Sequence, residues 1–128
     1  MKKQSLKGLK SKAWKLFSLY IRQRDDGVCY TCGIKQDFRS THAGHFIHGK
    51  KYPLSYFDER NVNCQCPRCN RFLSGNLTVY AQRLVKQYGP QILDELHAEK
   101  NTIRPGREFY ESIIEKYNPA GETKLTVL

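Results

Sequence analysis

The stretch that decides the fold is CQCPRCNRFLSGN, residues 64–76. It contains the pair Cys66 and Cys69, and a second pair with the same spacing, Cys29 and Cys32, precedes it with 33 residues between the pairs. Each pair can form a tight turn that aims both sulfur atoms at one point, so two such turns complete a tetrahedron. The spacing predicts a structural Zn²⁺ site. Disulfides or scattered buried thiols are the alternative, but no secretory segment indicates an oxidising compartment.

A chain of 128 residues buries only a modest core, and a structural zinc ion would add stability to it. We predict a flexible basic arm at residues 1–10 and a single zinc-containing domain at residues 11–118, with C-terminal helices from about residue 76. An irregular tail is predicted at residues 119–128. The fifth cysteine, Cys64, could be an alternative ligand, but we expect it to be buried instead.

The charge of the chain is large and unevenly distributed. The formal net charge is +10; residues 1–93 carry 17 basic and 5 acidic residues, whereas residues 94–128 carry 5 basic and 7 acidic residues. A field of this sign favours a polyanion, so branched or double-stranded DNA is the expected partner. A cationic surface can also serve solubility alone, although acidic residues do that better. No apolar run approaches the roughly 18 residues of a membrane span, so no membrane partner is expected.

Hydrophobic periodicity and turn residues predict an α+β fold. Ser11 is a suitable N-cap for a first helix, and Pro67 and Gly75 suit the start and the end of a helix opened by the second cysteine pair. The result is a zinc-stapled ββα-metal core, of the kind found in HNH nucleases, flanked by α-helices. The predicted elements are helices at 11–24, 76–88, 92–96 and 106–117, a short strand and its exit at 42–48 with His45 at the end of the strand, and a second short strand at 61–64.

Four polar residues on this frame could cut a phosphodiester. A histidine, an asparagine and a terminal histidine or asparagine around a zinc knuckle is the layout of the HNH nucleases. His45 is the predicted base, because an imidazole can take a proton from water near neutral pH. Asn70 is predicted to help His42 hold a catalytic Mg²⁺ or Mn²⁺, and Asn61 to fix the loop that aims His45. Taken singly, each of these residues is more often a satisfied polar group or a helix cap.

The runs 42–46 and 61–76 resemble the NinG family of lambdoid phages, also called Rap. The resemblance extends back to 14–22 and forward through 80–89, and so covers roughly residues 12–97. It implies a phage recombination nuclease that acts on branched DNA such as Holliday junctions and D-loops and uses a divalent metal. A chain encoded by a phage or prophage would work in the host cell cytoplasm.

The zinc frame is also similar to that of the endonuclease VII type of junction resolvase. In that enzyme a cysteine pair precedes the catalytic strand, and an asparagine metal ligand directly follows the second pair. The resemblance implies that His45 is the base and Asn70 a metal ligand. It makes the zinc ligands Cys29, Cys32, Cys66 and Cys69.

One position departs from that pattern. Many HNH enzymes have a metal-binding aspartate directly before the base, and this chain has Gly44 there. His42 is the predicted substitute, because two residues upstream on a strand lies on the same face. Asp58 and Glu59 are the alternative candidates for this metal ligand.

The exposed basic residues should contact the DNA phosphates, so DNA binding should weaken as the salt concentration rises. A homodimer is plausible, because symmetric cutting of a four-way junction wants two active sites. Two other functions stay open: a non-catalytic zinc-stabilised DNA-binding module, which Gly44 favours, and an HNH nicking enzyme without junction preference. The predicted DNA contacts are Lys12, Lys15, Lys50, Lys51, Arg68, Arg71 and Arg83.

Overall fold

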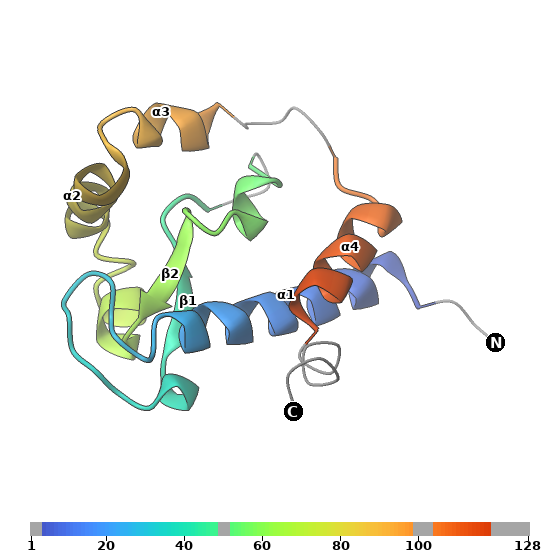
Figure 1. The fold of residues 1–128 in the computed structure, drawn as a ribbon, viewed down its shortest axis with the longest axis horizontal. Helices are drawn as coiled ribbons and strands as arrows, with labels where there is room; N and C mark the ends of the chain where they lie inside the picture. Colours follow the sequence, from blue (N-terminus) through green and yellow to red (C-terminus); the bar gives the residue numbers. More distant parts are fainter. Residues whose placement is uncertain (1–3, 49–51, 99–103, 119–128) are drawn as a thin grey trace. The chain divides into compact units, whose positions relative to one another are not determined.

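The computed structural model describes residues 4–48, 52–98 and 104–118. It contains helices and one two-stranded sheet, which confirms the predicted α+β class (Figure 1). Lys50, Lys51 and the predicted tail at 119–128 lie outside the described residues. The elements are α1 (Leu6–Arg24), η1 (Phe38–Ser40), β1 (His42–His45), η2 (Ser55–Phe57), β2 (Val62–Gln65), η3 (Arg68–Phe72), α2 (Leu77–Tyr88), α3 (Ile92–His97) and α4 (Arg107–Tyr117).

The chain divides into two compact units, one formed by residues 1–20 and 105–128 and the other by residues 21–104. In the first unit, Ala13 and Phe17 of α1 are buried, and the rings of Phe17 and Tyr117 meet edge to face at 5.0 Å. The single domain predicted for 11–118 stays a prediction, since two compact units can belong to one domain.

The first helix begins earlier than predicted. Ser11 is not its N-cap, because α1 already starts at Leu6. Ser5 caps it instead: its Oγ accepts a hydrogen bond from the Gly8 N–H at 3.0 Å. Residues 6–10 of the predicted arm are therefore helical. In the part of the chain that the structure describes, no helix is both long and apolar enough to cross a membrane.

Two short antiparallel strands, β1 and β2, form the hairpin of the second unit. His42 pairs with Gln65, Gly44 with Asn63, and His45 with Val62. β1 ends at His45, as predicted, and β2 lies one residue later than predicted. Because directly opposite residues share a face of the sheet, His42, Gly44, Asn63 and Gln65 lie on one side.

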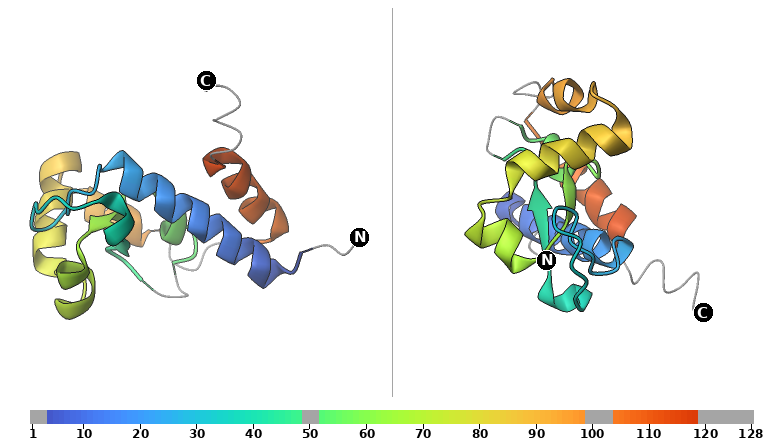
Figure 2. Two further views of the ribbon diagram at one scale, coloured as in Figure 1. Left: turned by 90° about the horizontal axis from the view of Figure 1, so that it is seen from below. Right: turned by 90° about the vertical axis from the view of Figure 1, so that its left-hand side faces the viewer.

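The core of this unit lies between the hairpin and the two helices that follow it. Tyr80 and Leu84 of α2, Ile92 and Leu96 of α3, and Ile47 after β1 are buried together. Figures 1 and 2 show α2 and α3 next to each other beyond the strands. The buried side of the helix predicted at 76–88 is thus core, and it fixes α2 against β1 and β2.

The helix predicted after the second cysteine pair is a π-helical turn, η3, in which Leu73 N–H bonds the Arg68 carbonyl at 2.9 Å. It ends in three consecutive residues with positive φ: Ser74 (51°), Gly75 (93°) and Asn76 (50°). Ordinary residues adopt this conformation at a cost, so a compensating contact is expected. Asn76 supplies one, since its Nδ2 lies 3.7 Å from Cys69 Sγ.

Candidate metal centre and active site

The four predicted zinc ligands converge. The sulfur atoms of Cys29, Cys32, Cys66 and Cys69 all lie within 4.8 Å of one another, and Cys32 Sγ is 3.7 Å from Cys66 Sγ. Zn–S bonds of about 2.3 Å in a tetrahedron place two sulfurs about 3.8 Å apart, so the donor set fits Zn²⁺. Three of the four thiols are buried, and Cys32 is exposed. The cluster can hold a zinc ion that ties the two cysteine turns together.

Neighbouring groups favour the thiolate form of Cys29, whereas burial raises the pKa of Cys32 and of Cys66. Burial raises the pKa of Cys29, but hydrogen bonds from the Thr31 hydroxyl and from backbone N–H groups outweigh it and lower the pKa to about 6. Thr31 Oγ1 lies 3.3 Å from Cys29 Sγ, and the Cys69 N–H points at Cys66 Sγ at 3.4 Å. Such donors favour the thiolate form that binds metal.

Cys64 lies outside the cluster. Its side chain is fully buried, as predicted, and burial raises the pKa of its thiol. Its backbone N–H donates to Asp25 Oδ2 at 2.9 Å, which links the end of α1 to β2.

His45 is buried at the end of β1, and its ring is held in one orientation. Its Nε2 lies 3.1 Å from the Tyr56 carbonyl oxygen, and its ring lies against the Tyr56 ring at a centroid distance of 4.4 Å. A carbonyl can only accept, so Nε2 carries the proton and Nδ1 has the basic lone pair. Burial lowers the pKa of His45 to about 4. The side chain is therefore a neutral imidazole at neutral pH.

Asn61 makes the contacts predicted for a residue that fixes the loop. It is fully buried just before β2, and its Oδ1 accepts from the Ile47 N–H at 2.8 Å. Its Nδ2 donates to the carbonyls of Ile47 (3.1 Å) and Ser55 (2.9 Å). Ser55 directly precedes Tyr56, so Asn61 holds the segment whose carbonyl orients His45.

His42 and Asn70 are brought into contact. Asn70 Nδ2 lies 2.9 Å from His42 Nδ1, which joins β1 to η3. Burial, followed by the charges of Arg71 and Arg22, lowers the pKa of His42. The two alternative carboxylate ligands form ion pairs with arginines: Asp58 pairs with Arg60 at 2.9 Å and Glu59 lies 3.8 Å from Arg24.

Gly44 is packed against two side-chain amides. A Cβ atom built on Gly44 would overlap Gln65 Oε1, and it would lie 2.9 Å from Asn70 Oδ1. Gln65 is fully buried; its Nε2 donates to Thr31 Oγ1 (3.1 Å) and to the Gly75 carbonyl (2.9 Å). Within the described residues, its Oε1 is buried and has no hydrogen-bond partner. This buried oxygen packs against the backbone of Gly44, and an amide oxygen without a hydrogen-bond partner is a donor of the kind that binds a hard divalent cation.

Tyr80, in the helix predicted at 76–88, is a positioning residue that was not among the predicted site residues. Its buried hydroxyl donates to the Gly44 carbonyl at 2.7 Å and accepts from Asn63 Nδ2 at 3.1 Å. Burial raises its pKa, so the hydroxyl keeps its proton. The polar alternation of Asn61, Asn63 and Gln65 along β2 was the signal that this face carries a hydrogen-bond network.

The predicted basic contacts are exposed wherever the structure describes them. Arg68 and Arg71 lie on η3, and Arg83 lies on α2 with its guanidinium 5.2 Å from the Tyr30 ring centroid. Lys12 and Lys15 are exposed on α1, in the other unit. Counting only described residues, the three arginines form no salt bridge, so their charges are available to an anion.

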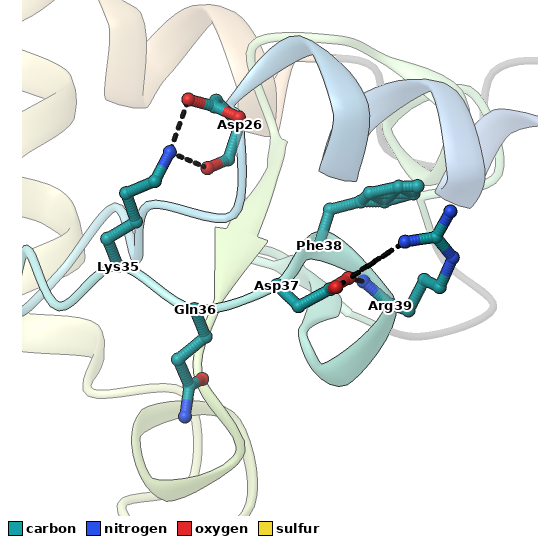
Figure 3. Close-up of a pocket in the computed structure, with 6 residues that line it drawn as sticks. All are labelled: Asp26, Lys35, Gln36, Asp37, Phe38 and Arg39. Carbon is teal, nitrogen blue, oxygen red and sulfur yellow. Dashed lines mark hydrogen bonds and ion pairs between the residues drawn. The ribbon is translucent and has the colours of Figure 1, made fainter.

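A cavity of about 510 Å³ lies along the segment between the first cysteine pair and β1 (Figure 3). Its charged side chains satisfy one another: Lys35 pairs with Asp26, and Arg39 pairs with Asp37 at 3.3 Å. Its lining contains none of the predicted site residues, so it adds nothing to the candidate site.

Comparison with known proteins gives one family. The family described as Bacteriophage Lambda NinG protein matches residues 1–125. Protein ninG of Escherichia phage 933W is 36% identical over 99 residues, which are 77% of this chain and 49% of the relative. Protein ninG of Escherichia phage lambda is 36% identical over 86 residues, 66% of this chain and 42% of the relative. Protein ninG of Salmonella phage P22 is 34% identical over 99 residues, 77% and 48%.

The chain spans about half the length of the curated relatives it matches. No solved structure matches it. The match to the family runs through both cysteine pairs, the hairpin and η3, which are the parts of the chain that form the candidate site. The chain belongs to the NinG family of bacteriophage proteins.

Proposed function

We propose that the chain is a metal-dependent DNA endonuclease of the HNH (ββα-metal) type that cuts branched recombination intermediates such as Holliday junctions and D-loops. The observation that carries the proposal is the contact between His42 on β1 and Asn70 on η3, at 2.9 Å. The same strand, β1, ends in His45. Cys69 lies on η3 and Cys66 directly follows β2, so a zinc ion bound by the cluster would fix η3 next to the turn that carries Cys29 and Cys32.

His45 is the general base of the proposal. With Nε2 donating to the Tyr56 carbonyl, Nδ1 is the atom that takes the proton from the attacking water. The water oxygen then bonds to phosphorus, and the bond from phosphorus to the leaving oxygen breaks. The low pKa keeps the imidazole unprotonated before DNA binds, and the negative charge of the phosphate favours the imidazolium that forms.

Asn70 would hold the Mg²⁺ or Mn²⁺ ion through Oδ1, and His42 would hold it through Nδ1 once that nitrogen exchanges the Asn70 amide for the metal. When bound, the ion would stabilise negative charge on the leaving oxygen. Nitrogen and amide oxygen donors without a carboxylate suit a weak site that the phosphate of the substrate completes. The arginine at position 71, whose charge lowers the pKa of His42, would also attract that phosphate.

Exposed basic residues beside the site support a DNA substrate. Arg68 and Arg71 on η3 flank the turn that carries Asn70, and Phe72 next to them is 80% exposed. An exposed aromatic ring beside arginines suits stacking on an unpaired base, as found at a branch point. Recognition would then rest on shape and phosphates rather than on base sequence.

The test uses the zinc-loaded protein with a labelled four-way junction and a linear duplex of the same sequence. Each is incubated with Mg²⁺, with Mn²⁺, and without added metal. We expect metal-dependent cuts in the junction, and a loss of about 100-fold or more in rate for His45→Ala with binding preserved. His48→Ala is the matched control, because His48 is an exposed histidine whose ring lies 5.8 Å from that of His45.

A second function is favoured by one observation, the glycine at position 44. Without the carboxylate that precedes the base in many HNH enzymes, the chain could be a zinc-stabilised DNA-binding module. Tight junction binding with no cuts under either metal would establish that function instead. Equal cutting of junction and duplex would establish an HNH nicking enzyme without junction preference.

A further inference from the structure

The face of the hairpin that lacks a carboxylate contains an unused oxygen. Gln65 is fully buried, yet its Oε1 has no hydrogen-bond partner among the described residues, while its Nε2 is fully used by Thr31 and Gly75. A buried acceptor left unpaired is destabilising, so a natural sequence retains one where something else compensates for it. The orientation of the amide is fixed from the Nε2 side, which aims the oxygen at Gly44.

We propose that Gln65 Oε1 is an oxygen ligand of the divalent metal and takes the place of the carboxylate that position 44 lacks. The inference rests on the proposed function and names a ligand that the sequence analysis missed. Gln65 reaches the site from β2, the partner strand, whereas the expected ligand would project from β1 itself.

The glycine at position 44 follows from this arrangement. Any side chain there would begin with a Cβ that overlaps Gln65 Oε1 and lies 2.8 Å from Gln65 Cδ. Glycine inside a strand marks a place where another group approaches the backbone closely. Glycine at position 44 and glutamine at position 65 thus belong together: the metal ligand comes from β2 instead of β1.

A second oxygen faces the same point. Asn70 Oδ1 lies 2.9 Å from the position of the Gly44 Cβ, and the contact between Asn70 Nδ2 and His42 Nδ1 turns that oxygen toward it. The contact with His42 therefore orients the Asn70 amide. The two amide oxygens form a neutral donor pair for a hard divalent cation.

The experiment measures Mn²⁺ binding to the zinc-loaded protein by the electron paramagnetic resonance signal of free Mn²⁺. Gln65→Met keeps the side-chain length and removes the oxygen, and Gln65→Ala removes both. Asn63→Ala is the matched control: it is a buried amide on the same face of β2, and its Nδ2 also makes two hydrogen bonds. Every variant is first checked for one zinc ion per chain and for cooperative unfolding.

We expect Gln65→Met and Gln65→Ala to weaken Mn²⁺ binding at least tenfold, and Asn63→Ala to change it less than threefold. Gly44→Asp alone should unfold more easily, because its Cβ overlaps Gln65. The double variant Gly44→Asp/Gln65→Ala should recover folding and bind Mn²⁺ more tightly than Gln65→Ala, since the carboxylate enters the vacated space. Mn²⁺ binding unchanged in both Gln65 variants would overturn the inference and assign Oε1 to contacts with the Gly44 Cα–H or the Asn70 amide.

Junction cutting, measured in parallel, separates this inference from the proposed function. If the wild-type chain cuts the junction and the Gln65 variants bind Mn²⁺ normally, the proposed function stands and Gln65 is not a metal ligand. If the wild-type chain cuts nothing and the Gln65 variants lose Mn²⁺ binding, Gln65 is a metal ligand and the proposed nuclease function is wrong.

Discussion

The four-cysteine cluster and the space beside Gly44 both take residues from the segment 65–70, but they offer different kinds of donor atom. The cluster offers four sulfurs within 4.8 Å of one another, which is a complete set for one zinc ion. The region beside Gly44 offers the amide oxygens of Gln65 and Asn70, with the His42 imidazole in contact with Asn70. A metal that holds a fold together needs all its ligands from the protein, whereas a metal that serves a reaction leaves positions for the substrate.

The two regions are also connected. Thr31 Oγ1 lies 3.3 Å from Cys29 Sγ and accepts from Gln65 Nε2 at 3.1 Å, so one hydroxyl touches both. Asn70 directly follows Cys69, and Gln65 directly precedes Cys66. Zinc binding should therefore set the positions of the groups beside Gly44, while changes beside Gly44 should leave zinc in place. The predictions below test that asymmetry.

The largest effect is expected from the sulfur cluster. Cys69→Ser should lose the zinc ion and unfold the unit at residues 21–104, because structural zinc sites contribute about 10–16 kcal/mol at pH 7. Cys64→Ser is the control, since Cys64 is a buried cysteine outside the cluster. Zinc content by mass spectrometry and thermal unfolding by circular dichroism distinguish the two. A Cys69→Ser protein that keeps one zinc ion and its unfolding temperature would break the comparison.

A smaller effect is expected from His45 as the pH falls. Its pKa is lowered from 6.5 to about 4 by burial, so between those values the unfolded chain binds a proton that the folded chain does not. The free energy of unfolding should be complete above pH 6.5 and fall by roughly 3 kcal/mol on acidification below pH 4. Urea titrations of the wild type and His45→Gln measure this. An unchanged pH dependence in His45→Gln, with His48→Gln as control, would contradict the buried neutral base.

Tyr80→Phe should cost about 1–3 kcal/mol, because it leaves the Gly44 carbonyl and the Asn63 amide without their buried partner. Zinc content should not change, since Tyr80 does not contact the cluster in any hydrogen bond of the described residues. The junction-cutting rate should fall, because Gly44 and β1 lose their support from α2. Full activity in a destabilised Tyr80→Phe protein would show that β1 is positioned without it.

The sequence predicted the sulfur cluster better than the amide site. A Cys-x-x-Cys spacing constrains its own turn, so all four ligands could be named without knowing the rest of the fold. His42, His45, Asn61 and Asn70 could be chosen by their order, and the structure brings His42 and Asn70 together. Their roles in catalysis stay predictions.

Gln65 and Tyr80 could not be found in the same way, because each acts across the fold. Tyr80 fits the apolar period of α2, and that pattern does not indicate a role for its hydroxyl. Gln65 lies between Cys64 and Cys66, and no local pattern indicates what its amide contacts. The glycine in β1 was the available signal, since it indicates close approach by another group. The π-helical form of η3 and the Ser5 cap were missed because both depend on hydrogen bonds that periodicity does not encode.

The smallest effect is expected from a single surface charge. Arg71→Ala should weaken junction binding by about 1 kcal/mol or less and reduce the slope of log affinity against log salt by about one. Lys86→Ala, an exposed basic residue on α2 that is not among the predicted contacts, is the control. Fluorescence anisotropy at several salt concentrations gives both numbers. Equal slopes for Arg71→Ala and the wild type would remove η3 from the DNA interface.

The most direct test of the account is the single-turnover rate at which the zinc-loaded chain cuts a four-way junction before and after Mn²⁺ is added. Two metal regions with separate tasks predict no cutting with zinc alone and strand cuts at the branch once Mn²⁺ is present. A junction that is bound tightly but never cut, with Mn²⁺ or with Mg²⁺, would contradict the account and leave the amide site without a catalytic role.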